Sequence, residues 1–445
     1  MSVNLEDVMI PLSLLDAALL SHNLPILYFF PPPPSSTFDL NKLHSSFMSL
    51  VEHDYPILIG EYHVDPKTGI VNVKQTSECR EKGAFGIKFE TKSTRFKSSE
   101  QAIRERSWEL MPSSREKNEL ISVKGTLLQD GGLAIGINTS HALFDGEAFF
   151  TFMTIWGQYY SGVKKEERQV VNHARYLLNE VGGPSKMKHP EFRVLLDHDL
   201  TTEAQLAAQA LPHTTNEFFH FTPIMMKKIK DLASHGGLDS QKSVKASYVS
   251  SVDAITALMT VLISRARKHG QDVRISTFVN ARRRLEPPLP PNYVGNAIFN
   301  AFLTVKSKEL QPQPEYEGLV SGATLNLIAR RVRESIIRCD DAYMRDALNF
   351  LAEQSNIAAV QIGTNYCFGP DLLFTSWLRL DMYGAEFDSV HPSHVFYPQL
   401  PGADGVVIFT EAQNGGEGID VGVLLACSAM ENLKKMFTEI SHFYS

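Results

Sequence analysis

The residues from Gly131 to Tyr160 constrain the fold of this chain more than any other stretch. Leu133, Ile135 and Ile137 alternate with small or polar residues, which is the period of two expected of a strand with one buried face. Large side chains then recur at helical spacing, at Phe149, Phe152, Met153, Trp156 and Tyr160. The stretch therefore predicts a strand that leads directly into a helix.

A turn signal precedes this strand. Asp130-Gly131-Gly132 is typical of a tight connection between two strands, and Val123 and Leu127 lie before it at positions that suit a partner strand. The chain is therefore expected to form a hairpin here, followed by the helix.

His141 lies in the short connection between the predicted strand and helix, which runs from Ser140 to Gly146. Such a connection holds a side chain rigidly while leaving it accessible to a ligand. A neutral imidazole, with an ordinary pKa of about 6.5, suits proton removal near neutral pH, so we interpret His141 as a candidate general base. A structural histidine is the competing interpretation, because a chain with 15 histidines contains about one His-x-x-x-Asp spacing by chance.

The length of 445 residues exceeds what one hydrophobic core usually serves, so two domains are expected. We expect an N-terminal domain over residues 1–190, a crossover over residues 191–217, and a C-terminal domain over residues 218–445. The crossover is polar and irregular, with an Ala-rich helix expected over Thr202 to Ala210. Other expected elements are a strand over 24–30, a helix over 38–51, strands over 70–73 and 85–89, and a helix over 324–351.

Charge and cysteine content exclude several classes of protein. A net charge of -7 argues against a general nucleic-acid or anionic-membrane binder, and no apolar run is long enough to span a bilayer. The first residues lack the basic segment of a secretory signal. Four cysteines occur without metal-ligand spacing, so we expect no metal site and reduced thiols in a cytoplasmic protein. The protein is also expected to be a monomer.

The second half contains two further informative segments. Ser250 and Asp253 have the spacing of a capping box at the start of an apolar helix that ends near Arg267. Farther on, three consecutive arginines, Arg282 to Arg284, follow an apolar strand and precede a proline-rich run that ends at Asn296. At least one of these guanidinium groups is expected to be buried and therefore paired with a carboxylate, although the spacing does not say which arginine takes which carboxylate.

The segment GGLAIGINTSHALFDG, residues 131–146, resembles the HXXXDG segment of the BAHD acyltransferases. These enzymes belong to the chloramphenicol acetyltransferase-like superfamily. Other segments resemble the same family: PLSLLD at 11–16, YPILIG at 55–60, the arginine and proline segment at 280–296, and TSW at 375–377. The resemblance implies an α/β (α+β) fold with two chloramphenicol-acetyltransferase-like domains, each a mixed β-sheet flanked by helices, and an active-site channel at their interface. It also implies that residues 370–395 cross back to the first domain.

The resemblance implies a set of site residues. His141 would be the general base, the Thr375 hydroxyl would donate to the developing oxyanion, and Trp377 would shape the wall. Asp145 would pair with Arg282 and hold the loop together with Gly146, while Glu386 would take the place of an aspartate that pairs with an arginine. Contacts to coenzyme A would come from the set Ser250, Ser251, Arg267 and Asn296.

Residues 383–392 depart from the family pattern YxADFGWGKP. Glu386 replaces Asp, Asp388 and Val390 replace two glycines, and Ser389 replaces Trp. The altered loop is more similar to fungal members of the superfamily than to plant members, which favours an acetyl donor and a secondary-metabolite hydroxyl as acceptor. It leaves open whether this loop still supports coenzyme A binding.

The resemblance implies a direct transfer from acyl-CoA, as a co-substrate, to a small-molecule alcohol, with no tightly bound cofactor. Three alternatives remain open at this point. The acceptor could be an amine, or the enzyme could be a condensation-type enzyme that takes its donor from a carrier protein, for which HHxxxDG is expected where Ser140 stands. A catalytically silent binding protein on the same fold is the third alternative, motivated by the altered loop. No Ser or Cys is placed beside His141 as a nucleophile, so no acyl-enzyme is expected.

Overall fold

The computed structural model describes most of the chain. It covers residues 6–66, 69–94, 97–113, 118–179, 181–195, 212–235, 248–312, 319–399 and 402–444. The helix expected over Thr202 to Ala210, and most of the crossover around it, lie outside these residues.

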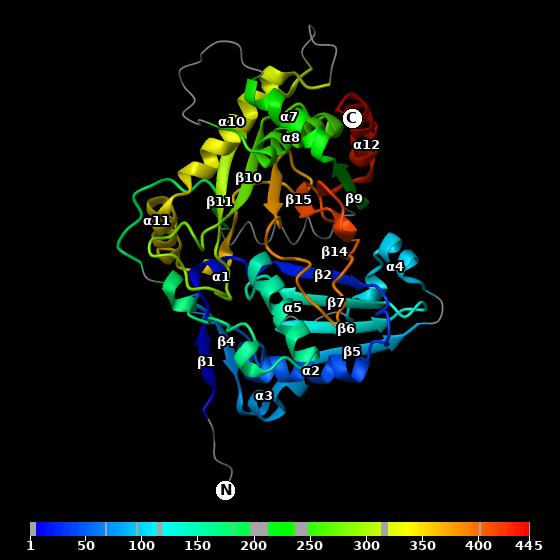
Figure 1. Ribbon diagram of the computed structural model, residues 1–445. Coiled ribbons are helices and arrows are strands. Elements are labelled where there is room, and N and C mark those ends of the chain that lie inside the picture. The colour runs from blue at the N-terminus through cyan, green and yellow to red at the C-terminus, as the bar shows by residue number, and fades with distance from the viewer. Residues whose placement is uncertain are drawn as a thin grey trace.

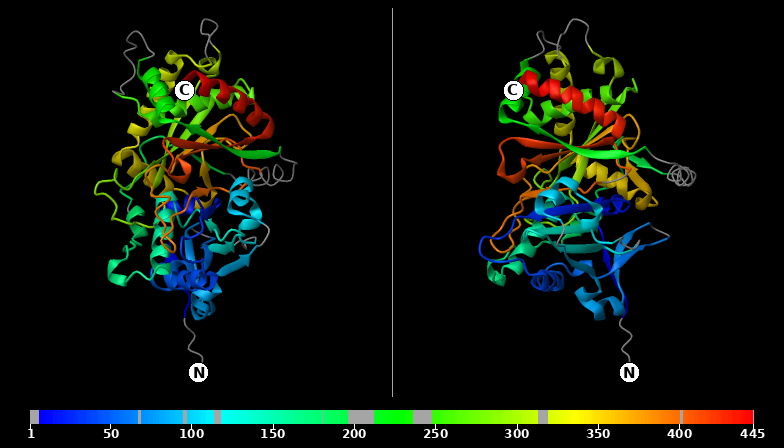
Figure 2. Two further views of the ribbon diagram at one scale, coloured as in Figure 1. Left: turned by 45° about the vertical axis from the view of Figure 1, so that its right-hand side comes forward. Right: turned by 90° about the vertical axis from the view of Figure 1, so that its right-hand side faces the viewer.

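Two sheets dominate the structure, one formed mainly by the first half of the chain and one by the second (Figure 1). The two halves stay stacked one above the other in the rotated views (Figure 2). The N-terminal sheet has the strand order β14 (His394–Phe396), β2 (Asn23–Phe30), β7 (Leu133–Ser140), β6 (Ile121–Leu127) and β5 (Lys88–Ser93). The C-terminal sheet has the order β11 (Ile298–Val305), β10 (Val273–Asn280), β13 (Leu372–Ser376), β15 (Val406–Glu411), β16 (Ile419–Ala426) and β9 (Thr214–Phe221).

The N-terminal sheet is built around the predicted hairpin. β6 and β7 pair antiparallel, with Leu127 opposite Leu133 and Val123 opposite Ile137, which confirms the prediction. All eight residues of β7 are buried, because β2 and β6 flank this strand and both of its faces are covered. The helices of this half are α1 (Leu14–Ala18), α2 (Leu40–His53), α3 (Ser77–Lys82), α4 (Ser99–Glu105) and α5 (Gly146–Tyr160).

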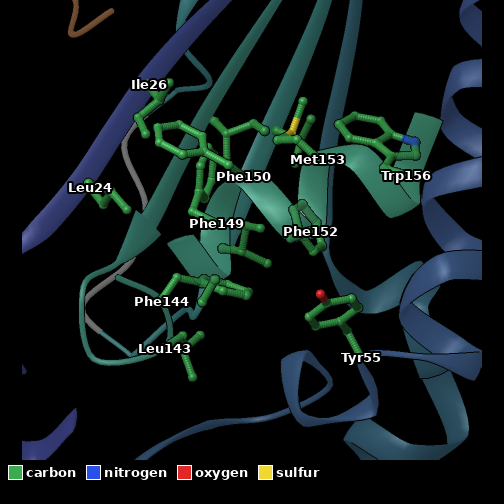
Figure 3. Close-up of a cluster of buried hydrophobic side chains, with 14 of the residues drawn as sticks. Leu24, Ile26, Tyr55, Leu143, Phe144, Phe149, Phe150, Phe152, Met153 and Trp156 are labelled. Carbon is green, nitrogen blue, oxygen red and sulfur yellow. The ribbon is translucent and has the colours of Figure 1, made fainter. Parts of the chain in front are cut away.

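Helix α5 carries the aromatic core of this half. Its side chains at the predicted helical spacing pack with residues of α2 and with Tyr55, and Phe152 meets Tyr55 edge to face at a centroid distance of 5.0 Å (Figure 3). Trp156 donates a hydrogen bond from its indole nitrogen to the Ser46 hydroxyl (3.0 Å). This packing fixes the start of α5, and with it the connection that carries His141.

One face of the C-terminal sheet is covered by helices. α8 is buried along most of its length against α7, α10 and α12, and the capping box predicted at its start is present between Ser250 and Asp253. The bounds of the helices in this half are α7 (Pro223–His235), α8 (Ser251–Arg267), α9 (Ser307–Leu310), α10 (Gly322–Arg338), α11 (Asp341–Ala352) and α12 (Cys427–Tyr444). The opposite face of the sheet is turned toward the N-terminal half.

The C-terminal half of the chain returns to the N-terminal sheet at β14. Val395 lies opposite Tyr28 of β2 in an antiparallel pair, and in Figure 1 the orange strand β14 lies beside the blue strand β2. Two small sheets complete the structure: β1 (Val8–Pro11) with β4 (Val71–Gln75) and β3 (Glu61–Val64), and β8 (Phe192–Val194) with β12 (Val360–Ile362).

Several expected elements have different bounds. Residues 83–86 form a 3-10 helix that leaves Phe85 exposed, and strand β5 begins only at Lys88. The single helix expected over 324–351 is two helices, because Asp340 caps the start of α11 with its side chain and so begins a new helix. β9 begins at Thr214, within the range expected as crossover. Within the part of the chain that the structure describes, no helix is both long enough and apolar enough to cross a membrane.

Candidate active site

His141 follows β7 directly and lies where the two halves meet. It lines a cavity of about 340 Å³ that opens to solvent. The cavity is bounded below by the start of β2 and the loop from His141 to Glu147, and above by the C-terminal sheet. His141 thus lies beside a space that is large enough for small-molecule substrates.

The roof of the cavity follows from the alternation of side chains along β13. Leu373 and Thr375 line the cavity, whereas Leu372 and Phe374 belong to the core under the helices; past Thr375 the alternation ends, and both Ser376 and Trp377 line the cavity. Successive side chains of a strand point to opposite faces, so one strand both anchors the C-terminal core and presents a hydroxyl to the cavity. The resemblance placed Thr375 and Trp377 at the site, and the structure brings both to the cavity of His141.

The ring of His141 is held by Asn296, which lies 155 residues away in sequence. The distance from His141 Nδ1 to Asn296 Oδ1 is 3.2 Å. The Asn296 amide nitrogen donates to Asp16 Oδ1 (2.9 Å) and to the backbone oxygen of His141 (2.7 Å). These two donor bonds fix the orientation of the amide, so its oxygen accepts a hydrogen bond from the N–H group of His141 Nδ1. The tautomer that follows carries its lone pair on Nε2, the atom that a general base would use.

Asp16 anchors this arrangement. It is fully buried, accepts a hydrogen bond from the backbone nitrogen of Asn296 (2.8 Å), and forms an ion pair with Arg175 Nη1 at 2.6 Å. Ser13 and Asp16 also form the capping box of α1. The PLSLLD segment therefore has a structural explanation: its aspartate begins a hydrogen-bonded chain from Arg175 through Asn296 to His141.

Burial lowers the pKa of His141 below its ordinary value. The hydrogen bonds to its own backbone oxygen and to Asn296 oppose this effect in part, as does the charge of Asp145. The net direction favours the neutral imidazole at pH 7, which is the protonation state that accepts a proton.

The predicted ion pair between Asp145 and Arg282 is present. Arg282 Nη1 donates to Asp145 Oδ2 (2.7 Å) and Nη2 donates to Oδ1 (2.9 Å), a bidentate pair in which Asp145 is 1% exposed. Burial would raise the pKa of Asp145, but the charge and hydrogen bonds of Arg282 outweigh it and lower the pKa. Asp145 also caps α5, by accepting from the backbone nitrogen of Ala148 (3.0 Å), so it holds the loop and does not act as a partner of the His141 ring.

Gly146 permits the close approach of the two halves at the site. A Cβ atom at Gly146 would lie 3.3 Å from the indole ring of Trp377 and 3.4 Å from Leu380, closer than side chains ordinarily pack. Trp377 in turn packs edge to face on Phe150 of α5. The glycine therefore lets the wall residue Trp377 seat directly on the start of α5.

Thr375 presents a hydroxyl to the same cavity as His141. Within the described ranges its side chain has no hydrogen-bond partner, and it is partly exposed to the cavity. A free donor at this position is what stabilisation of a developing oxyanion requires.

The four residues expected to contact coenzyme A do not lie together in the structure. Ser251 lies at the start of α8 and lines an open groove with Lys227 and Lys230. Ser250 beside it is already used, since its hydroxyl caps α8 and accepts a hydrogen bond from Arg333 (2.8 Å). Only the start of α8 thus remains a suitable place for an anionic group.

Two of those expectations are wrong. Arg267 lies at the other end of α8, about 25 Å from Ser251 along a helix of 17 residues, and its buried guanidinium pairs with Asp404 at 2.5 Å. Asn296 is fully buried between Asp16 and His141. Neither side chain is available to a coenzyme, because each is already committed to a buried polar partner.

The expected pairing of Glu386 with an arginine is also wrong. Its carboxylate lies 3.5 Å from His391 Nε2 and is half exposed. The backbone of this residue packs on Gly157 of α5, where a Cβ atom would lie 2.5 Å from the Glu386 carbonyl oxygen. The backbone of residue 386, rather than its side chain, therefore makes the contact that docks the loop on α5.

The altered loop is nevertheless well anchored. Asp388, which stands in place of a glycine in the family pattern, has a φ of 49°, a conformation that glycine adopts without strain. Its carboxylate accepts a hydrogen bond from Tyr160 (2.7 Å) and pairs with Lys42 at 3.2 Å. These contacts hold the loop in the turn that a glycine would otherwise permit.

The comparison with protein-family models gives a match to the family described as "Transferase family" over residues 2–440. The chain belongs to this family, that of the BAHD acyltransferases. Of the curated relatives, hydroxycinnamoyl-CoA:piscidic acid hydroxycinnamoyltransferase of Actaea racemosa is 25% identical over 333 residues, which cover 72% of this chain and 70% of the relative. Tryptamine benzoyltransferase 1 of Oryza sativa subsp. japonica is 25% identical over 320 residues, or 69% of this chain and 66% of the relative.

Solved BAHD-type structures share the fold. TRI101 of F. graminearum, crystallised with coenzyme A and deoxynivalenol, superposes with a TM-score of 0.73 at 18% identity and covers 96% of this chain and 97% of that one. Vinorine synthase gives a TM-score of 0.65 at 19% identity, with 98% of this chain and 97% of that one covered. The α/β fold with two sheets flanked by helices, expected from the resemblance, is therefore confirmed.

Sequence reasoning missed three residues that the structure places at the site. Asp16 had a signal, the PLSLLD segment, but no assigned role. Arg175 had none, because it begins a 3-10 helix of only 4 residues, which is too short to show a periodic pattern. His22 precedes β2 and lines the cavity beside His141, and a lone histidine at a strand start gives no indication of this. Within the described part of the chain, no three His, Cys, Asp or Glu side chains are arranged to hold a metal ion.

Proposed function

We propose that this BAHD protein is an acyl-CoA-dependent O-acyltransferase that moves an acyl group, acetyl in the simplest case, to a hydroxyl of a small molecule. The observation that carries the proposal is the His141 ring, with its Nε2 lone pair at a cavity between the two halves and its Nδ1 proton bound by Asn296. A neutral base fixed in this way can accept the proton of an alcohol as the alcohol attacks a thioester. The chloramphenicol-acetyltransferase-like domains are proposed to follow the two sheets, with the site between them.

The proposed reaction is a direct transfer. His141 Nε2 takes the hydroxyl proton while the alcohol oxygen bonds to the thioester carbonyl carbon. The carbonyl oxygen becomes anionic, and the Thr375 hydroxyl, which has no other partner among the described residues, donates to it. The intermediate then collapses, the carbon to sulfur bond breaks, and the imidazolium returns its proton to the sulfur. The products are the ester and free coenzyme A.

The donor is proposed to enter at the Trp377 end of the cavity. β13 and β15 end there. The groove at the start of α8 borders the same end of the sheet, because it contains Gly418, which precedes the residue opposite the last residue of β15. Ser251, Lys227 and Lys230 line this groove. A helix start with two nearby lysines suits the phosphates of coenzyme A. This assignment replaces the two wrong expectations, Arg267 and Asn296, and retains Ser251.

Substitution of the lysines in the groove at the start of α8 tests donor binding separately. Replacing both Lys227 and Lys230 by alanine is expected to raise the KM for acetyl-CoA about tenfold with little change in kcat, because each lysine would contact a charged phosphate. Lys228 lies between them on the same helix, and Lys228→Ala is the matched control for a general loss of surface charge. An unchanged KM in the double variant would move the phosphate site elsewhere.

An amine acceptor is the second candidate. One observation favours it: the relative tryptamine benzoyltransferase 1, which is 25% identical to this chain, is named for benzoyl transfer to an amine, tryptamine. The carrier-protein alternative rests on fold likeness alone, since the condensation domain of a polyketide synthase superposes with a TM-score of 0.56 at 12% identity.

The test of the proposed function is a thiol-release assay with acetyl-CoA. Free coenzyme A is expected to appear faster when a suitable alcohol is added, and its release is expected to depend on His141. A protein that binds coenzyme A but releases no thiol with any alcohol or amine would be a silent binding protein. Faster release with amines than with matched alcohols would make it an N-acyltransferase.

A further inference from the structure

The cavity has two chemically different ends. At the Leu373 end, opposite Trp377, the lining combines aliphatic side chains with a few polar groups that carry no charge near pH 7. This lining comes from the start of β2, from β12, and from the beginnings of β13 and β15 and the end of β16, which lie side by side in register. The apolar residues are Leu19, Leu24, Ile362, Leu373, Val406 and Leu424.

The charged residues of the lining gather at the other side of His141. Of the described residues that line the cavity, Asp145, Glu147 and Arg282 are the charged ones. Asp145 and Arg282 neutralise each other at 2.7 Å. Glu147 accepts a hydrogen bond from Asn280 and lies 3.9 Å from Arg282 Nε, so its charge is also engaged. None of these three side chains is at the Leu373 end.

The titratable groups at the Leu373 end are neutral near pH 7. Burial, and then the nearby His141, lower the pKa of His22 to about 4. Burial raises the pKa of Tyr366 to about 12 and also raises the pKa of Cys367. This end of the cavity therefore offers no countercharge to an ionised substrate.

His22 brings a polar atom to the border between this end and the base. Its backbone oxygen accepts a hydrogen bond from the backbone nitrogen of His141 (2.9 Å), so both residues are held at the same point of the cavity wall. The ring nitrogen Nδ1 of His22 lies 3.2 Å from the Ser21 hydroxyl. Its other nitrogen, Nε2, has no protein partner among the residues that the structure describes, and His22 is one of the residues that line the cavity.

We propose that the acceptor is an uncharged, largely apolar alcohol that occupies the Leu373 end of the cavity and is oriented by the Nε2 atom of His22 beside His141. The inference rests on the proposed function and deepens it. His22 forms one hydrogen bond to the substrate, to the reacting hydroxyl or to an adjacent oxygen, while the apolar side chains bind the carbon skeleton. It is a binding residue, and the proton transfer stays with His141.

Desolvation explains why charged acceptors are excluded. Moving a carboxylate or an ammonium group from water to a neutral apolar wall is costly unless a counterion meets it there. The same wall favours a carbon skeleton in proportion to the apolar surface that it buries. An acid or an amine that bears the same hydroxyl should therefore bind more weakly than the neutral compound.

A matched trio of acceptors tests the charge requirement. Methyl 4-hydroxycyclohexanecarboxylate, its free acid and 4-(aminomethyl)cyclohexanol carry the same ring and hydroxyl but differ in charge. With acetyl-CoA as donor, and with larger bicyclic trios in parallel, kcat/KM for the neutral member is expected to exceed that of both charged members by at least about tenfold. Equal or better turnover of the acid, or of the hydroxyl of the amine, would overturn the proposal.

Failure of this inference and failure of the proposed function are distinguishable. The proposed function fails if no compound produces His141-dependent release of coenzyme A. The inference alone fails if such release occurs but only with charged acceptors, or with water and with no neutral alcohol in the panel. In that case the Leu373 end would not be the acceptor site.

Variants of His22 test the orientation. His22→Phe retains a planar ring but removes the nitrogen, and it is expected to raise the KM for the neutral alcohol about tenfold while the KM for acetyl-CoA changes less than about twofold. His22→Gln restores a hydrogen-bonding atom and is expected to recover part of the loss. An unchanged KM for the alcohol in His22→Phe, or equal rises in both KM values, would contradict the role of His22.

Discussion

Two buried ion pairs flank His141, and they differ in what they hold. Asp16 pairs with Arg175 at 2.6 Å on one side, and Asp145 pairs with Arg282 at 2.7 Å on the other. The first pair connects to the imidazole through Asn296. The second pair binds the backbone around it, through the capping of α5 and through Arg282 bonds to the carbonyl oxygens of Tyr293 and Gly295.

The comparison shows that similar buried charges can serve different purposes. Leaving one partner of a buried pair alone is strongly destabilising in either case. Only the Asp16 chain, however, ends in a hydrogen bond to Nδ1 of His141, so only this chain selects the tautomer of the His141 ring. The Asp145 pair instead joins the loop of the N-terminal half to the strand end of the C-terminal half.

The largest expected effect is the loss of stability that follows removal of the Asp145 carboxylate. Asp145→Ala leaves the Arg282 guanidinium buried without its carboxylate and is expected to cost about 3 to 5 kcal/mol of unfolding free energy, measured by denaturant titration. Asp145→Asn is the matched control, since it keeps the size of the side chain and the cap of α5 and should cost less. A change below about 1 kcal/mol in Asp145→Ala would contradict a structural role for the pair.

A smaller but more specific effect is expected at Asn296. Asn296→Ala removes the acceptor for the Nδ1 proton of His141 and is expected to lower kcat about tenfold at pH 7, with the KM for acetyl-CoA nearly unchanged. Because the Asn296 hydrogen bond raises the pKa of His141, its loss should also move the acid limb of the rate profile to lower pH. A fall in kcat with an unmoved acid limb would indicate general loosening rather than loss of tautomer control.

The pH dependence of kcat/KM for the native protein tests whether the His141 ring is neutral near pH 7. Burial lowers the pKa of His141, so the neutral base should persist below pH 6.5. We expect the midpoint of the acid limb of kcat/KM, at which His141 becomes protonated, to lie below pH 6.5. A fall that begins above pH 7 would mean that a raised pKa, and hence a charged partner of the ring, controls the base.

A second buried histidine, His189, has its pKa shifted in the opposite direction, and its substitution is expected to have the smallest effect. His189 lies between Glu191 (2.8 Å) and Asp346 (3.0 Å). Burial lowers the pKa of His189, but the hydrogen bonds to the two carboxylates outweigh it and the net shift is upward. Its charged form therefore stabilises the fold below pH 6.5, and this contribution is lost as the pH rises through the folded pKa.

Unfolding experiments can check the contribution of His189. The difference in unfolding free energy between the native protein and His189→Gln is expected to be larger at pH 5.5 than at pH 8.5. A difference that grows toward pH 8.5 would mean that His189 is buried in its neutral form, as His141 is.

Local patterns were sufficient to predict the elements around His141. The hairpin and α5 follow from residues within about thirty positions of each other, because strand and helix periods are local properties. The pair of Asp145 and Arg282 spans 137 residues and was predicted from the family resemblance, while the residues alone required only that a buried arginine be paired.

The roles that were missed depend on distant partners. Asn296 was expected to bind the coenzyme, but its partners Asp16 and His141 are 280 and 155 residues away, and no local period encodes such contacts. Arg267 was also expected to contact the coenzyme, but its guanidinium pairs with Asp404, which lies 137 residues later in the chain. The backbone contact of Glu386 with Gly157 is invisible to side-chain patterns for the same reason.

The most direct test of the account is acetyl-CoA thiol release by the native protein and by His141→Ala, each with and without a neutral ring alcohol. The native protein is expected to release coenzyme A with formation of the acetyl ester, and the variant to lose about 100-fold or more of that rate. Its melting temperature should stay within a few degrees of the native value, because the anchoring pairs of Asp16 and Asp145 remain. A folded His141→Ala protein that forms ester at the native rate would contradict general-base catalysis by His141, and with it the central claim.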